Sequence, residues 1–174
     1  MNPFIEQALL IKDELINYRR IIHENPEVGA VLPKTKAFVM DKLKEFGYEP
    51  TEICESGIVA TISGEKPGKT FLLRADMDAL PMKEETSCDF KSTNGCMHSC
   101  GHDMHTAMLL GAAKLLKQNQ SQIEGTIKLV FQPDERGFTG AKKMIAAGVL
   151  ENPKVDAAMA MHVHSGTPSN LVLM

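Results

Sequence analysis

The segment KTFLLRADMD, residues 69–78, begins with a continuous apolar run and contains two aspartates at its end. Such a run is typical of a strand buried on both faces of a sheet, because neither face then needs polar side chains. In open α/β sheets, ligands bind in the crevice beyond the carboxyl ends of the strands. The segment therefore predicts a central strand over residues 69–75, with Asp76 and Asp78 at the edge where a site would lie.

Predicted helices and strands alternate on both sides of this segment. Apolar residues at helical spacing indicate helices, and short apolar runs indicate strands. The expected helices cover residues 3–24, 33–46, 103–117 and 139–147. The expected strands cover residues 51–54, 58–63, 69–75, 126–131 and 155–161, with a last short strand over 171–174. This alternation predicts an α/β layer structure with a mostly parallel sheet.

Length and charge exclude several classes of protein. The chain has 174 residues, with 19 Lys and Arg against 22 Asp and Glu, a net charge of −3. A slightly acidic chain has no electrostatic reason to bind nucleic acid or an anionic membrane surface. No apolar run approaches the roughly 18 residues of a membrane-spanning helix. The first residues lack the basic and apolar regions of a secretory signal, so we expect a cytoplasmic protein.

The densest group of reactive side chains is CMHSCGHDMH, residues 96–105, directly before a predicted helix. Thiolate and imidazole ligands together suit zinc, or another divalent metal such as cobalt, nickel or manganese. Two alternatives are a reduced set without a metal, and a closed structural zinc site. Structural sites take four ligands, often from C-x₂-C pairs, whereas this spacing is C-x₃-C beside strand-end carboxylates. The pattern favours an open, catalytic metal site.

Two further predicted strands also end in polar residues. Asp134 and Glu135 follow the strand over 126–131, and His162 follows the strand over 155–161. One such loop would be a solvated turn, but three in succession favour a site. A glutamate that does not bind metal can take a proton from the attacking water and pass it to the leaving amine, and Glu135 is the candidate. Asp78 is suited to orient a metal ligand from behind.

Several motifs together resemble a known enzyme superfamily, the metal-dependent amidohydrolases of the aminoacylase/carboxypeptidase superfamily. The match is closest to the branch of hippurate hydrolases, bacterial N-acyl-amino-acid amidohydrolases and plant auxin-conjugate hydrolases. The motifs are YRRIIHENPEVG (18–29), LLRADMDALP (72–81), SCGHDMHTAMLLGAAKLL (99–116), VFQPDE (130–135) and AMHVHSGTP (160–168).

This resemblance implies a three-layer αβα domain of the zinc-exopeptidase type with two divalent metal ions: manganese, zinc, cobalt or nickel. It also implies hydrolysis of the amide bond of a small N-acyl amino acid to a carboxylic acid and a free amino acid.

The resemblance also implies residue roles. Cys100 and His102 match the metal-binding Cys-Gly-His motif, and His162 matches a later metal ligand. Glu135 matches the general base, and Asp78 matches the acidic residue that supports the site. Supporting roles are implied for Asp76, Asp103 and His105. His164 is expected to lie near the site without binding metal. The remaining cysteines and histidines are expected to be packing or surface residues: Cys54, Cys88, Cys96, His23 and His98.

Two departures from the family pattern bear on activity. The pattern reads Gln-Pro-x-Glu-Glu, and its second Glu is a metal ligand. Here that position is Arg136. Its guanidinium is cationic and offers only hydrogen-bond donors, so it cannot coordinate a metal ion. Relatives of this superfamily also continue through a lid and dimerisation domain and form homodimers or homotetramers. Residues 1–174 are thus expected to be the N-terminal part of a di-metal catalytic domain with an unpaired sheet edge. The alternative function is a truncated, catalytically impaired remnant that binds metal weakly.

Overall fold

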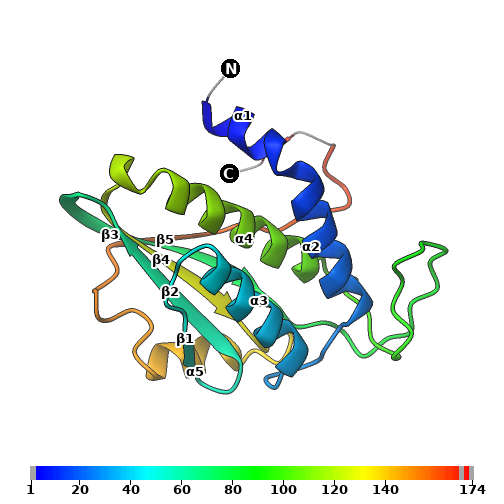
Figure 1. Cartoon of the computed structure of the whole chain (residues 1–174). Coiled ribbons are helices and arrows are strands. Elements are labelled where there is room, and N and C mark those ends of the chain that lie inside the picture. Colours follow the sequence, from blue (N-terminus) through cyan, green and yellow to red (C-terminus); the bar gives the residue numbers. More distant parts are fainter. Residues whose placement is uncertain (1–2, 169–170, 173–174) are drawn as a thin grey trace.

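The predicted central strand is β3 (Lys66–Asp76) in the computed structural model, which describes residues 3–168 and 171–172. It lies in a five-stranded sheet of order β1-β2-β4-β3-β5 (Figure 1). The other strands are β1 (Thr51–Ile53), β2 (Gly57–Ser63), β4 (Glu124–Gln132) and β5 (Ala157–Ala160). The helices are α1 (Pro3–Leu10), α2 (Lys12–Glu24), α3 (Pro33–Glu45), α4 (His102–Gln118) and α5 (Gly140–Ala146), with a 3₁₀ turn η1 (Gln120–Gln122).

The sheet is mixed, because β2 runs opposite to the other four described strands, which share one direction as expected. β3 pairs in parallel with β4 and β5, whereas β2 pairs antiparallel with both β1 and β4. The difference follows from the connections. β1 and β2 are joined by a tight turn, which makes neighbouring strands antiparallel, while helices α4 and α5 supply the long crossovers that parallel strands need. The α/β class is confirmed, and the parallel part of the sheet is the part that carries the candidate site.

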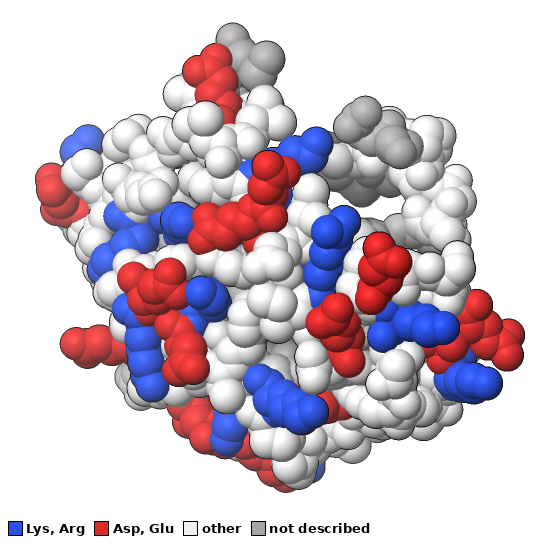
Figure 2. Space-filling view, turned by 45° about the vertical axis from the view of Figure 1, so that its right-hand side comes forward, with Lys and Arg blue, Asp and Glu red and all other residues white. Residues whose placement is uncertain are grey.

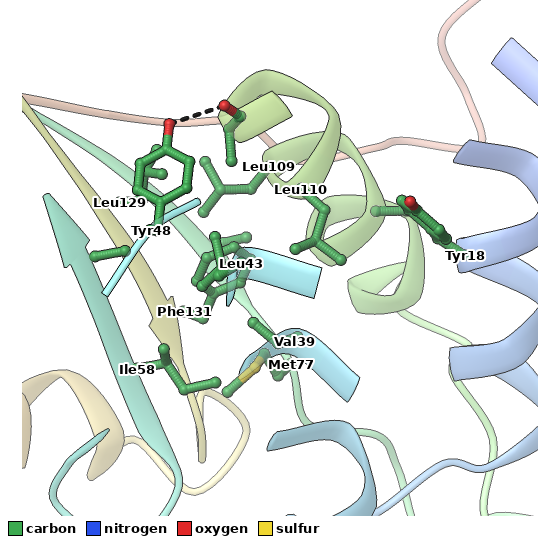
Figure 3. Close-up of a cluster of buried hydrophobic side chains, with 14 of the residues drawn as sticks. Tyr18, Val39, Leu43, Tyr48, Ile58, Met77, Leu109, Leu110, Leu129 and Phe131 are labelled. Atoms are coloured by element: carbon green, nitrogen blue, oxygen red, sulfur yellow. Dashed lines mark hydrogen bonds between the residues drawn. The ribbon is translucent and has the colours of Figure 1, made fainter. Parts of the chain in front are cut away.

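Helices cover both faces of the sheet, which gives the three expected layers. α3 and α4 pack on one face, with α2 outside α4, and α5 packs on the other (Figure 1). In β4, Leu129 and Phe131 belong to the first core and Val130 to the second, because side chains alternate between faces. Figure 3 shows Leu43, Leu110 and Phe131 among the side chains of the larger core.

Element boundaries differ from expectation at both ends of the chain. The helix expected over residues 3–24 is divided at Ile11, whose backbone (φ −101°, ψ 8°) leaves helical geometry. Of the strand expected over 171–174, residues 171–172 have no regular structure and 173–174 lie outside the described residues. No described helix is long and apolar enough to cross a membrane.

The sheet face under α5 contains a buried lysine that the sequence analysis did not single out. Lys128 of β4 is 2% exposed. Its Nζ donates to the carbonyl oxygens of Val149 (3.0 Å), Glu151 (2.7 Å) and Pro153 (2.9 Å). Burial lowers the pKa of its ammonium group. These three bonds fix the segment between α5 and β5, and thereby the strand that leads to His162.

β5 forms one edge of the sheet and is exposed along its whole length. The apolar side chains of Met159 and Met161 are 47% and 50% exposed.

On the face drawn in Figure 2, acidic and basic side chains are intermixed, so that this face has no large area of one sign of charge.

Candidate metal centre

The three parallel strands end at one edge of the sheet and bring distant residues together there. Asp76 ends β3, the loop after β4 carries Glu135, and His162 follows β5. α4 begins at the same edge with His102. Gly101 precedes it with φ 86°, and a Cβ at this position would lie 2.3 Å from Cγ2 of Val163. Only glycine combines this left-handed backbone with so close an approach.

Cys100, His102 and His162 form a compact set of metal-ligand atoms. One donor atom from each lies within 4.8 Å of the others, and Cys100 Sγ is 3.4 Å from His162 Nε2. Zinc bonds of about 2.0–2.3 Å in tetrahedral geometry place ligand atoms roughly 3.4–3.8 Å apart. His102 is buried, Cys100 is partly buried and His162 is exposed. The three residues therefore match a divalent metal in both donor type and spacing.

His102 has the surroundings of a metal ligand. Both of its ring nitrogens are buried and have no hydrogen-bond partner among the described residues, which is costly without a ligand. Its Nδ1 lies 3.4 Å from Asp78, while Nε2 lies 3.6 Å from both Asp76 and Glu135. A carboxylate behind the second nitrogen is the usual arrangement of metal-binding histidine. Burial lowers the pKa of His102, but the carboxylates of Asp78 and Asp76 outweigh it and the pKa is raised.

Asp78 connects the loop after β4 to His102. Its two carboxylate oxygens accept the backbone N–H groups of Glu135 (3.0 Å) and Arg136 (3.1 Å). Burial raises the pKa of Asp78, but His102 and these two N–H groups outweigh it and lower the pKa. Asp78 is therefore ionised at neutral pH and holds both the general-base candidate and the candidate metal ligand.

His105 is adjacent to the centre but its nitrogens are already occupied. Nδ1 donates to Asp76 Oδ1 (2.6 Å), and Nε2 accepts the backbone N–H of Val163 (3.0 Å). These bonds position the segment carrying His162. Asp76, His102 and His105 also have donor atoms within 4.8 Å, but His105 has no nitrogen left for a metal. Burial raises the pKa of Asp76, but His105 and Arg74 outweigh it and the pKa is about 2.

Glu135 and Arg136 lie at the open side of the centre. Glu135 Oε2 is buried without a hydrogen-bond partner in the described part of the chain and faces His102 Nε2. Arg136 is exposed, and its guanidinium makes no ion pair with any described carboxylate. Burial raises the pKa of the Cys100 thiol, and the positive charge of Arg136 opposes this shift. Arg136 thus adds positive potential where a metal would bind.

Asp103 supports the centre from behind through a buried network. Its Oδ2 accepts from Arg19 Nε (2.6 Å) and His23 Nδ1 (2.8 Å). His23 Nε2 in turn lies 3.1 Å from Glu84 Oε1, and the hydrogen bond to Asp103 raises the pKa of His23. His23 was expected from the sequence to be a packing or surface residue. The sequence signal for its role is the four-residue spacing of Arg19 and His23, which puts both on one helix face.

Glu84 provides a pH-dependent test of this network. Burial raises the pKa of Glu84, but bonds from Thr86, His23 and the backbone of Ser92 outweigh it and lower the pKa from 4.5 to about 2. A lowered folded-state pKa adds stability above the unfolded-state pKa, and this is lost as pH falls toward the folded-state value. We expect Glu84→Gln to flatten the fall in unfolding free energy between pH 4.5 and 2, measured by urea titration. Exposed Glu85→Gln is the control, and an unchanged slope in Glu84→Gln would contradict the assignment.

An α/β domain with thiol, imidazole and carboxylate groups gathered at its strand ends has the features of a metal-binding domain. Residues 72–173 match the model of peptidase family M20/M25/M40, and the chain belongs to this family. The description of the family is that of peptidases, and divalent metals accord with the ligand set described above.

The relatives include proteins that act on acylated or peptide substrates. Thermostable carboxypeptidase 2 of Saccharolobus solfataricus is 47% identical over 92% of this chain and 42% of its own length. N-acyl-L-amino acid amidohydrolase of Geobacillus stearothermophilus is 42% identical over 89% of this chain and 42% of its length. A Bacillus subtilis structure, the YxeP protein, described as a dinuclear metal binding peptidase, is 39% identical with a TM-score of 0.86, covering 90% of this chain and 44% of that one. The chain spans about two-fifths of the length of these relatives.

Proposed function

We propose that this chain is part of the catalytic domain of an amidohydrolase that cleaves the amide bond of small, hippurate-like N-acyl amino acids. The observation that carries the proposal is the buried, unpartnered imidazole of His102, surrounded by Cys100, His162 and carboxylates. The names of relatives such as the N-acyl-L-amino acid amidohydrolase support the substrate class.

Cys100, His102 and His162 are the proposed metal ligands. A divalent ion held by them, manganese, zinc, cobalt or nickel, would polarise the scissile carbonyl and lower the pKa of water at the site. Asp78 orients His102 through Nδ1. Asp76 and His105 hold the segment that carries His162, and Asp103 anchors α4 to α2.

Glu135 is the proposed general base. Its unpartnered Oε2 faces the metal ligands, where it can accept a proton from the attacking water and pass it to the leaving amine. Asp78 fixes the backbone of Glu135, which keeps the carboxylate at this position. Glu135 is therefore proposed to transfer the proton of the attacking water, while Cys100, His102 and His162 hold the metal ion.

The proposal is tested by hydrolysis of N-acetyl and N-benzoyl amino acids with manganese, cobalt or zinc added. Glu135→Gln is expected to lower kcat by about 10²–10⁴-fold, the range for general acid–base catalysis, without changing metal content. The product amine is measured with an amine reagent, and metal content by elemental analysis. A Glu135→Gln variant with unchanged kcat would exclude Glu135 as the base.

The alternative, an impaired remnant that binds metal weakly, is favoured by one observation. Arg136 occupies the position of a metal-ligand Glu in the related pattern, and its charge acts on Cys100. In the same assays, this alternative predicts negligible turnover and fewer than two tightly bound metal ions per chain, with a gain of metal in Arg136→Glu. Two ions bound at the Cys100–His102–His162 centre of the unaltered protein would exclude it. Cytoplasmic location, assembly into homodimers or homotetramers, and a lid domain outside residues 1–174 remain predictions from the sequence.

A further inference from the structure

A second group of ligand atoms lies outside the candidate centre. His23 of α2 meets Glu84 and Cys88, which belong to the loop between β3 and α4. One donor atom from each lies within 4.8 Å of the others. Imidazole, carboxylate and thiolate are the three ligand types that zinc takes in proteins. We propose that His23, Glu84 and Cys88 form a second site for zinc or a similar borderline divalent metal.

Hydrogen bonds already orient the imidazole for this role. His23 Nδ1 donates to the buried carboxylate of Asp103 at 2.8 Å, and Nε2 faces Glu84 and Cys88. A carboxylate on one ring nitrogen directs the other nitrogen to a metal and makes it more basic. Because His23 and Asp103 are buried, the direction of Nε2 is fixed by packing.

The other two ligands are similarly placed. Glu84 Oε2 accepts the backbone N–H of Ser92 at 2.7 Å, while Oε1 faces His23 and also accepts the hydroxyl of Thr86 at 2.5 Å, a bond that a second lone pair of Oε1 allows beside a metal. Glu84 Oε1 lies 3.1 Å from His23 Nε2 and 3.7 Å from Cys88 Sγ. The second separation lies within the roughly 3.4–3.8 Å between ligand atoms of a tetrahedral zinc ion with bonds of about 2.0–2.3 Å, and the first is slightly shorter. Small movements of the side chains are therefore enough to bind the ion.

Charge and access also suit a cation. On binding, the Nε2 proton of His23 and the thiol proton of Cys88 pass to solvent, leaving a neutral imidazole, a thiolate and a carboxylate. The two anionic ligands balance a divalent ion. Cys88 is partly buried and Thr86 beside it is exposed, so an ion and a water ligand can reach the site from solvent. Three protein ligands leave the fourth position open.

Cobalt(II) titration of the full chain distinguishes this site from the candidate centre, because each site has its own cysteine. Thiolate bound to cobalt gives a charge-transfer band in the near ultraviolet. Starting from Cys100→Ser, we expect a remaining band that is lost when Cys88→Ser is added. Cys96→Ser in the same background is the matched control, since Cys96 is equally half-buried in the same loop. A band that persists after Cys88→Ser would overturn the proposal.

Alkylation of the unaltered chain gives a second readout. With free zinc at about 100 times its dissociation constant, only about 1% of the site stays unoccupied, so iodoacetamide should modify Cys88 about 100-fold more slowly. Cys54, outside both ligand groups, should react at the same rate with and without zinc. Peptide mass spectrometry measures both rates. Unchanged alkylation of Cys88 in saturating zinc would overturn the site without affecting the proposal for Cys100, His102 and His162.

Discussion

Replacing His102 with alanine is expected to lower the zinc affinity of the Cys100–His102–His162 centre by at least about 100-fold. Substitutions of residues that merely orient metal ligands already cost about 10–100-fold, so loss of the ligand itself should cost more. The stability of the metal-free chain is measured separately, because His102→Ala also removes the contacts of the imidazole with Asp76, Asp78 and Glu135.

The affinity is best measured by competition with a chelating dye in the Cys88→Ser background, so that only one site is counted. His164→Ala is the matched control, since His164 lies two residues after His162 but belongs to no ligand group. Its affinity should equal that of the parent. Equal zinc affinity in His102→Ala and the parent would refute the centre, provided that thermal unfolding shows the variant to be folded.

Replacing Lys128 with methionine is expected to lower the free energy of unfolding by about 3–5 kcal/mol, because three carbonyl groups lose their donor at about 1–3 kcal/mol each and removal of the buried charge offsets part of this. Methionine keeps the length and apolar body of the side chain, so the change tests the ammonium group. The segment that leads to β5 should loosen first, since its carbonyls are the acceptors.

Urea unfolding of Lys128→Met measures this loss. Lys142→Met is the control, because Lys142 is exposed on α5 and surface substitutions usually stay within about 0.5 kcal/mol. A loss below about 1 kcal/mol in Lys128→Met would mean that water replaces the ammonium group at the three carbonyls. The expected order of stabilities is therefore parent and Lys142→Met together, with Lys128→Met well below them.

The sequence predicted a structural feature correctly where a local pattern of residues is itself the physical cause of that feature. The run at residues 69–75 became β3 because continuous apolar side chains can be buried on both faces. Helix and strand types were correct for all of the longer elements, and the ends shifted by a few residues. Cys100, His102 and His162 could be placed together because parallel strands end at one edge of a sheet.

Local sequence patterns could not predict which strands pair with each other in the sheet. Nothing near β2 in the sequence indicates that it pairs antiparallel with β4, and this makes the sheet mixed. The buried position of Lys128 is likewise set by a loop that lies more than 20 residues away along the chain.

The sequence by itself determined which reactive groups the chain offers, because thiol, imidazole and carboxylate groups are fixed by residue type and the strands deliver them to one edge. Only the tertiary structure decided which of these groups have hydrogen-bond partners. His105 bonds Asp76 and Val163, whereas His102 has no hydrogen bond, so one positions a segment and the other is free to bind metal. His23, taken from the sequence as a bystander, meets Asp103 and Glu84 across separations of 80 and 61 residues. Ligand and support differ in their hydrogen bonds, and those bonds exist only once distant segments have packed.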